Sequence, residues 1–123
     1  MAVVLLYNIE KGKAAKLKML CRDFYMESRE VARGDFGLKI ADLLSENRGG
    51  VLAAGEDFDE EMLYFADISP SFLGIFLDQM RRKRLAVALK AIKTETNAEF
   101  TSYELYKELS AEREAMSKGK VAH

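Results

Sequence analysis

Short apolar runs alternate with amphipathic stretches along this chain, and the alternation restricts the folds that it can adopt. The runs at 3–7 and 62–65 are apolar without a break, which is typical of strands buried on both faces. Weaker strand patterns lie at 26–31 and within 85–92. Stretches with one apolar stripe at helical spacing separate the strands and follow the last one, at 13–24, 38–44, 69–83 and 101–116.

The order of these elements is β-α-β-α-β-α-β-α, which predicts the α/β class. We expect a single three-layer domain, in which a small, mostly parallel sheet of about four strands has helices on both faces. The expected strand order is 2-1-3-4, with Leu5, Leu63 and Val87 among the buried residues. At 123 residues the chain fits one such domain, which we place at 1–116, followed by a flexible C-terminal tail at 117–123.

Capping residues mark two of the helix starts. Ser69 followed by Pro70 predicts a helix that begins at the proline, because a serine can accept from first-turn amides and proline lacks the N–H that would otherwise be unpaired. Thr101 and Glu104 have the spacing of a capping box, which predicts that the last helix begins there.

The chain lacks the residues on which several classes of function depend. It has one histidine, His123 at its end, and one cysteine, Cys21. A Ser-His-Asp or Cys-His catalytic unit, an internal disulfide and a metal site of several histidines or cysteines are therefore not expected. We assign no catalytic residue, no metal ligand and no cofactor.

Charge and hydropathy also argue against two kinds of partner. The 19 basic and 20 acidic side chains give a net charge of −1, which creates no long-range attraction for nucleic acid or anionic lipid. The apolar N-terminus has no basic segment before it, and no later apolar stretch approaches the ~20 residues of a membrane-spanning helix. We expect a cytoplasmic protein that binds neither a membrane nor nucleic acid.

Three blocks in the last third of the chain resemble a family of small bacterial proteins catalogued only as a domain of unknown function. The blocks are Met62-Leu63-Tyr64-Phe65 with Ser69 and Phe76-Leu77, then Leu89-Lys90-Ala91-Ile92-Lys93-Thr94-Glu95-Thr96-Asn97, then Phe100-Thr101 with Glu104-Leu105, Glu108-Leu109 and Glu112. The second block is the most specific, and the likeness extends weakly to the N-terminal strand and Leu20-Cys21. The resemblance implies an α/β fold and a bacterial origin, and it implies no activity or site residue.

Polar residues that follow the predicted strands form a candidate ligand site. In a parallel sheet, ligands bind at the carboxyl ends of the strands, and the free N–H groups of a following helix attract anions. The same residue types are also ordinary in turns and helix caps, and no glycine-rich phosphate loop is present. The candidate residues, which we expect at one edge of the sheet, are Asn8, Ser69, Thr94, Thr96 and Asn97.

Three further features have simpler structural explanations. Cys21 lies on an apolar helix stripe, which predicts a buried and slowly reacting thiol. The acidic run 56–61 lacks the spacing of a calcium loop and is expected to be a solvated loop. The basic run Arg81–Arg84 ends a predicted helix, where cations interact favourably with the helix dipole.

The helix predicted at 69–83 carries one apolar residue off its buried stripe. Ile75 falls outside the stripe, and the adjacent Gly74 allows another chain to approach closely. A single exposed apolar residue is also common on protein surfaces. We therefore interpret the chain as a non-enzymatic binding or regulatory module whose partner, a protein or a small molecule, is unknown. A homodimer is a further expectation, with its contacts at Gly74 and Ile75. The alternative is a small enzyme or anion-binding domain that uses the loop Thr94–Asn97.

Overall fold

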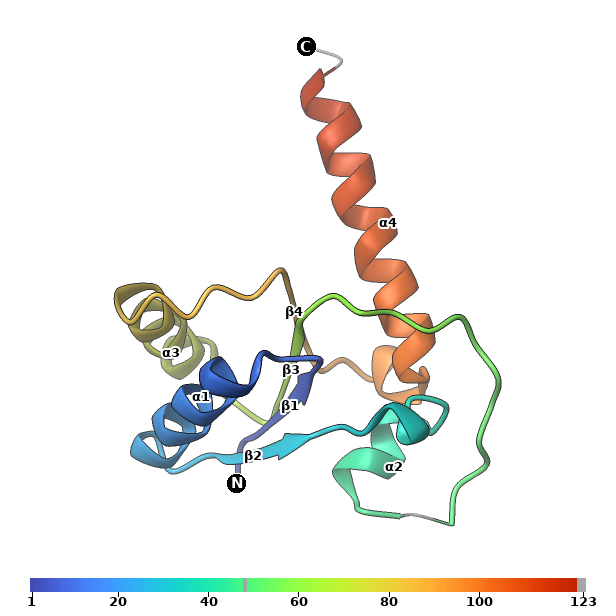
Figure 1. The fold of residues 1–123 in the computed structure, drawn as a ribbon, viewed down its shortest axis with the longest axis horizontal. Helices are drawn as coiled ribbons and strands as arrows, with labels where there is room; N and C mark the ends of the chain where they lie inside the picture. Colours follow the sequence, from blue (N-terminus) through green and yellow to red (C-terminus); the bar gives the residue numbers. More distant parts are fainter. Residues whose placement is uncertain (48, 122–123) are drawn as a thin grey trace. The chain divides into compact units, whose positions relative to one another are not determined.

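The computed structural model describes residues 1–47 and 49–121. Strands and helices alternate along the chain (Figure 1), which confirms the α/β class. Two short 3₁₀ turns, η1 (Arg33–Asp35) and η2 (Asn97–Glu99), accompany them. The strands and helices are β1 (Val3–Tyr7), α1 (Lys11–Asp23), β2 (Glu27–Glu30), α2 (Ile40–Leu44), β3 (Met62–Ala66), α3 (Pro70–Arg82), β4 (Leu89–Ile92) and α4 (Ser102–Val121).

The chain forms two compact units. Unit 1 comprises residues 1–32 and 59–93, and unit 2 comprises residues 33–58 and the chain from Thr94 onward. Unit 1 therefore contains the whole sheet with α1 and α3, whereas α2 and α4 belong to unit 2.

The sheet of unit 1 has the predicted strand order, β2-β1-β3-β4, but it is mixed. β1 pairs with β2 and β3 pairs with β4 in parallel, whereas the central pair β1–β3 is antiparallel. The prediction of a mostly parallel sheet is therefore wrong. The reason lies in the long connection between β2 and β3, which carries no crossover that returns the chain to the edge where β1 begins.

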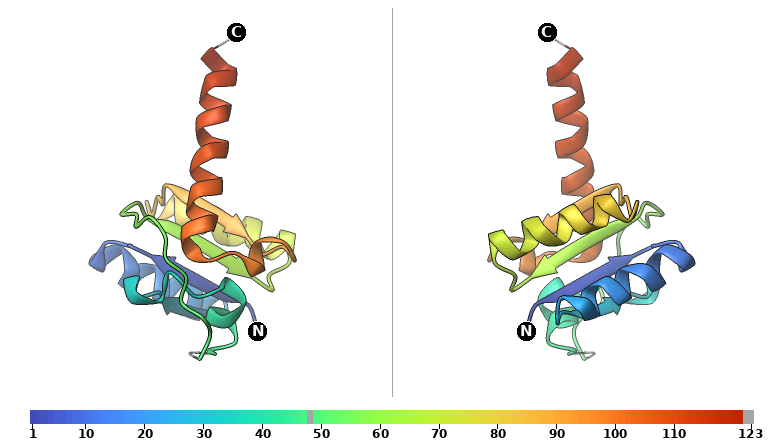
Figure 2. Two further views of the ribbon diagram at one scale, coloured as in Figure 1. Left: turned by 90° about the vertical axis from the view of Figure 1, so that its right-hand side faces the viewer. Right: turned by 90° about the vertical axis from the view of Figure 1, so that its left-hand side faces the viewer.

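Both helices of unit 1 lie on the same face of the sheet, as Figure 2 shows for α1 in blue and α3 in yellow. They cover Val4, Leu6, Leu63 and Phe65, which form one buried core with apolar residues of both helices. The expectation of helices on both faces does not hold within this unit. Two crossovers of the same hand, joined through an antiparallel strand pair, place their helices on one face.

Unit 1 consists of two βαβ halves with corresponding elements. α1 begins at Lys11 and α3 at Pro70, 59 residues later, and the helices end at Asp23 and Arg82, again 59 residues apart. In the antiparallel pair β1–β3, Leu5 lies opposite Tyr64, its own equivalent in the second half. An approximate two-fold axis therefore passes through the sheet between these two strands.

The two helices end in the same way. After α1, Met26 N–H donates to Cys21 O at 2.8 Å and Tyr25 N–H to Arg22 O at 3.0 Å. After α3, the equivalent bonds join Leu85 to Met80 and Arg84 to Arg81, at 2.9 and 3.1 Å. Both ends are Schellman motifs, which place one residue in the left-handed region. That residue is usually glycine, but here it is Tyr25 (φ 56°) and Arg84 (φ 57°).

The core of unit 2 is aromatic. Phe58 stacks on Phe36, with ring centroids 4.8 Å apart, and on Tyr106 of α4, at 4.2 Å. Phe36 also meets the ring of Tyr103 edge-on at 6.0 Å. These contacts attach the segment before β3 to the first turns of α4.

Several predicted boundaries can be compared with the structure. Thr101 and Glu104 form the predicted capping box, because each side chain accepts from the backbone N–H of the other, at 3.2 and 2.9 Å. α4 then extends to Val121, past the predicted end near Met116. Val87 is buried as expected but precedes β4. His123 lies outside the described residues.

Candidate binding surfaces

The first two residues of the predicted ligand site lie at opposite edges of the sheet. Asn8 follows β1, whose last residue, Tyr7, pairs with the first residue of β3. Ser69 follows β3, whose last residue, Ala66, pairs with Val3 at the beginning of β1. The expectation that Asn8 and Ser69 emerge at one edge is wrong, because it assumed that β1 and β3 are parallel.

Both residues have clear structural roles. Asn8 adopts φ 57°, a left-handed conformation that asparagine tolerates, and its Nδ2 donates to Glu60 O at 3.2 Å. Ser69 is the N-cap of α3, and its Oγ accepts from Phe72 N–H at 3.2 Å, as predicted. Pro70 occupies the first helical position.

The loop from Thr94 to Asn97 is closed by two reciprocal hydrogen bonds. Thr94 N–H donates to Asn97 Oδ1 at 2.8 Å, and Asn97 N–H donates to Thr94 Oγ1 at 3.0 Å. Thr96, between them, is exposed and its side chain makes no capping bond to η2. These bonds stabilise the start of η2. Asn97 Oδ1 and Thr94 Oγ1 each already accept one hydrogen bond from the turn.

Cys21 is confirmed as a buried residue, with 1% of its surface exposed. Burial raises the pKa of its thiol from the ordinary 9.0 to about 11, so the neutral thiol dominates at neutral pH. We expect slow reaction with thiol reagents in the native protein, because the thiolate is the reactive form. Burial and the nearby Asp67 also raise the pKa of Tyr64 in β3.

The two halves of unit 1 are joined by polar contacts at the beginning of α1. Lys13 Nζ forms an ion pair with Glu61 and donates to Ala86 O at 2.7 Å. Glu61 also accepts from Glu10 N–H at 2.9 Å. Part of the acidic run 56–61 therefore stabilises unit 1 instead of forming only a solvated loop.

Two broad classes of site can be assessed for the described residues. Within 1–47 and 49–121, no three His, Cys, Asp or Glu side chains are grouped so that they could hold a metal ion. None of the helices in these ranges is long and apolar enough to cross a membrane.

The outer side of α3 presents apolar side chains. Ile75 is 55% exposed and Phe72 is 38% exposed. A Cβ atom added at Gly74 would meet no atom within 4 Å, so the helix backbone is open to close approach there. The structure thus places both predicted interface residues, Gly74 and Ile75, at the surface.

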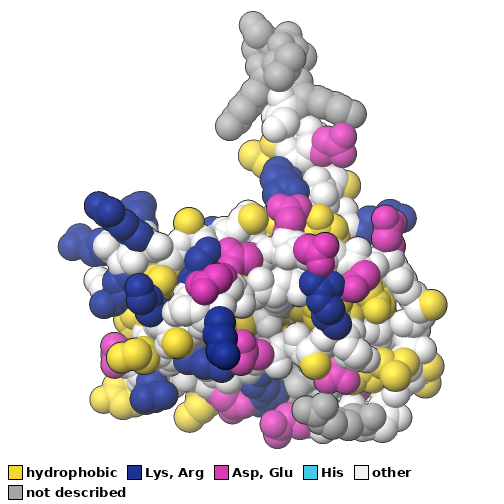
Figure 3. All heavy atoms as spheres, in the orientation of Figure 1, with side chains coloured by type: hydrophobic (Ala, Val, Ile, Leu, Met, Phe, Trp, Pro, Cys, Tyr) yellow, Lys and Arg dark blue, Asp and Glu magenta, His cyan; other side chains and the backbone are white. Residues whose placement is uncertain are grey.

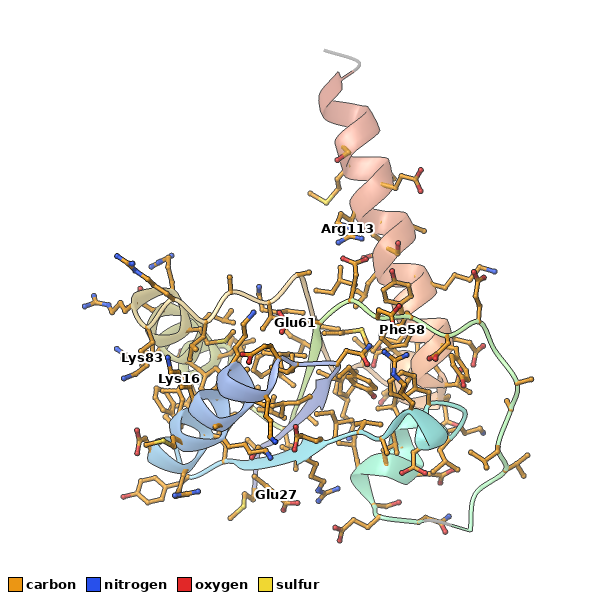
Figure 4. The ribbon with its side chains drawn as sticks, in the orientation of Figure 1. Lys16, Glu27, Phe58, Glu61, Lys83 and Arg113 are labelled. Atoms are coloured by element: carbon orange, nitrogen blue, oxygen red, sulfur yellow. The ribbon has the colours of Figure 1, made fainter. Side chains whose placement is uncertain are left out.

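A second surface was not foreseen from the sequence. Because α1 and α3 share a face of the sheet, the lysines of α1 and the basic run at the end of α3 lie in one helix layer. Figure 3 shows basic side chains gathered over these two helices, and Figure 4 labels Lys16 and Lys83, one from each. No local sequence pattern predicts this layer, because it depends on both helices lying on one face of the sheet.

Comparison with known proteins identifies part of the chain. No curated protein and no solved structure matches it. Residues 61–116 match the model of a domain of unknown function, DUF3783, which confirms the predicted resemblance to a family of this kind. From β3 to the middle of α4, the chain is therefore similar to the DUF3783 family, a domain for which no function is established.

Proposed function

We propose that this protein is a non-enzymatic binding or regulatory module of the bacterial cytoplasm that self-associates through α3. The observation that carries the proposal is the exposure of Ile75 and Phe72 beside Gly74. Phe72, Gly74 and Ile75 lie within about one turn of α3, so a partner helix can cover them together.

A second copy of the chain suits this surface for energetic reasons. Burying an isoleucine side chain fully contributes about 1.5–3 kcal/mol, and a two-fold symmetric contact uses each side chain twice. Gly74 permits the close helix approach that such a contact needs. Asp78 lies three residues after Ile75 on α3, and its charge is neutralised by ion pairs with Arg81 and Arg82, which lessens its cost near an apolar contact around Ile75.

Light scattering during size-exclusion chromatography tests this proposal. We expect the wild type to be a dimer at high concentration and Ile75→Glu to be a monomer, because the charge would be buried unpaired at the contact. Leu52→Glu is the matched control, since Leu52 is also a large exposed apolar residue but belongs to unit 2. A wild type that stays monomeric, or a dimer indifferent to Ile75→Glu, contradicts the proposal.

The alternative is a small enzyme or anion-binding domain that uses Thr94–Asn97. The reciprocal bonds between Thr94 and Asn97 favour a structural role for this loop instead. Titration with inorganic phosphate, followed by NMR of the backbone amides, distinguishes the two. Saturable shifts confined to residues 94–97 would support the alternative.

A further inference from the structure

α1 and α3 are antiparallel neighbours in the helix layer of unit 1. At one end, the ring of Phe24, just after α1, lies 5.1 Å from the ring of Phe72 in the first turn of α3. At the other end, Lys13 in the first turns of α1 donates to Ala86 O, beyond the end of α3. The beginning of α1 therefore lies beside the end of α3.

This neighbourhood joins two basic segments that are far apart in the sequence. We call the combined set the basic surface. It is made of exposed side chains from the first half of α1 and from the last turn of α3 and the residues after it. Its members are Lys11, Lys16, Arg81, Arg82, Lys83 and Arg84.

The basic surface has little opposing charge. Lys11, Lys16, Lys83 and Arg84 form no salt bridge with any residue in the described part of the chain. Arg81 and Arg82 both pair with the carboxylate of Asp78, so one negative charge serves two positive ones.

Glu10 is a second acid near the basic surface, and its carboxylate interacts electrostatically with Lys16. Glu10 is the N-cap of α1 and accepts from Gly12 and Lys13 N–H groups, at 2.9 and 2.8 Å. The six cations of the basic surface therefore exceed the two nearby carboxylates, Asp78 and Glu10, and the excess positive charge can attract an external anion.

The net charge of the whole chain is near zero and therefore gives no indication of the basic surface. Basic side chains outnumber acidic ones in unit 1, and acidic ones outnumber basic ones in the remainder of the sequence. The expectation that the protein avoids nucleic acid was based on the total charge and on interpreting the run Arg81–Arg84 as a helix end, whereas binding depends on how cations from different segments are arranged in space.

We propose that the basic surface binds the phosphate backbone of nucleic acid. Arginine and lysine side chains are the groups that neutralise successive phosphates, and a group of them from two neighbouring helices suits a polyanion. An anionic membrane fits less well, because it requires apolar side chains that insert among the cations. In unit 1 the exposed aromatic residues Tyr25 and Phe72 lie at the opposite end of the helix pair.

Fluorescence polarisation with short labelled DNA, single-stranded and duplex, tests the proposal on the full chain. We expect the wild type to bind at about 50 mM salt and to lose affinity steeply towards about 200 mM. The double variants Lys11→Glu/Lys16→Glu and Lys83→Glu/Arg84→Glu should each weaken binding at least ~10-fold and make the salt dependence less steep by about two phosphate contacts.

The control is Lys39→Glu/Lys107→Glu, which makes the same change of charge on two exposed lysines of unit 2. It should keep the affinity of the wild type within about twofold. Circular dichroism shows whether each variant is folded.

Three results would overturn the proposal: a wild type that does not bind DNA at low salt, a control that loses as much affinity as the test variants, or binding to phosphatidylglycerol vesicles without binding to DNA. The inference is independent of self-association. Ile75→Glu, whether monomeric or not, is expected to retain DNA binding, so the two proposals can fail separately.

Discussion

The two βαβ halves of unit 1 match in which positions are buried and differ at most of their exposed positions. Leu17 of α1 and Phe76 of α3 are equivalent, and both are buried against the sheet. One position earlier, Lys16 is equivalent to Ile75, and both are exposed. Packing therefore fixes the shared scaffold, whereas each exposed helix face has its own chemistry. The apolar contact proposed on α3 and most residues of the basic surface lie at exposed positions that differ between the halves; the exception is Arg81, which is equivalent to Arg22.

The largest effect is expected when one buried side chain is truncated at equivalent positions of the two halves. We expect Phe76→Ala to cost about 3–5 kcal/mol of unfolding free energy and Leu17→Ala about 2–5 kcal/mol, because each leaves a cavity in one common core. Urea denaturation measures both. If either variant cost less than ~1 kcal/mol, that half would contribute little to the core and the equivalence would be limited to the backbone.

The helix caps sharpen the comparison, since equivalent positions use different chemistry. Ser69→Ala should lower stability by about 1 kcal/mol at any pH between neutral and mildly acidic, because a hydroxyl does not titrate there. Glu10 differs, because the N–H groups of Gly12 and Lys13 lower the pKa of its carboxyl below the ordinary 4.5.

The sign of the pH effect follows from that shift. The contribution of Glu10 to stability is present above its ordinary pKa and is lost as the pH falls through the lower folded value. We therefore expect Glu10→Ala to destabilise the protein at neutral pH and to have little effect in acid. Urea denaturation of the wild type and both variants across this range checks it, and an acid-sensitive effect of Ser69→Ala would contradict the assignment.

The smallest expected effect concerns the residue after each helix. Tyr25 and Arg84 are both held in the left-handed region, which glycine occupies at lower cost. Tyr25→Gly and Arg84→Gly should each raise stability by about 0.5–1 kcal/mol. The matched controls Tyr25→Ala and Arg84→Ala remove the side chain but keep Cβ, and they should show no such gain. A gain at only one of the two positions would show that the two Schellman ends are not energetically equivalent.

Local features of this fold could be predicted from sequence, and long-range ones could not. The caps at Ser69 and Thr101 depend on residues within one turn, so their patterns were sufficient. Strand direction in the centre of the sheet depends on the edge at which β3 enters, and no local pattern encodes that. The expected meeting of Asn8 and Ser69 was wrong for this reason.

The repeat was missed because the halves share a pattern of burial and few identical residues. Ile9 and Ile68 are identical equivalents, but the buried pairs differ in type, such as Cys21 and Met80. The basic surface was also missed. Its two segments are neighbours only because both helices lie on one face of the sheet.

The antiparallel centre of the sheet would allow a short connection between β2 and β3. β2 ends at the same edge of the sheet where β3 begins, with only β1 between them, because Glu30 pairs with Leu6 and Met62 with Tyr7. Neighbouring strands are about 4.8 Å apart, so a gap of roughly 10 Å separates these ends, and a turn of a few residues would close it. The connection between β2 and β3 instead comprises residues 31–61. The connection between the two βαβ halves is therefore much longer than the pairing of β1 with β3 requires.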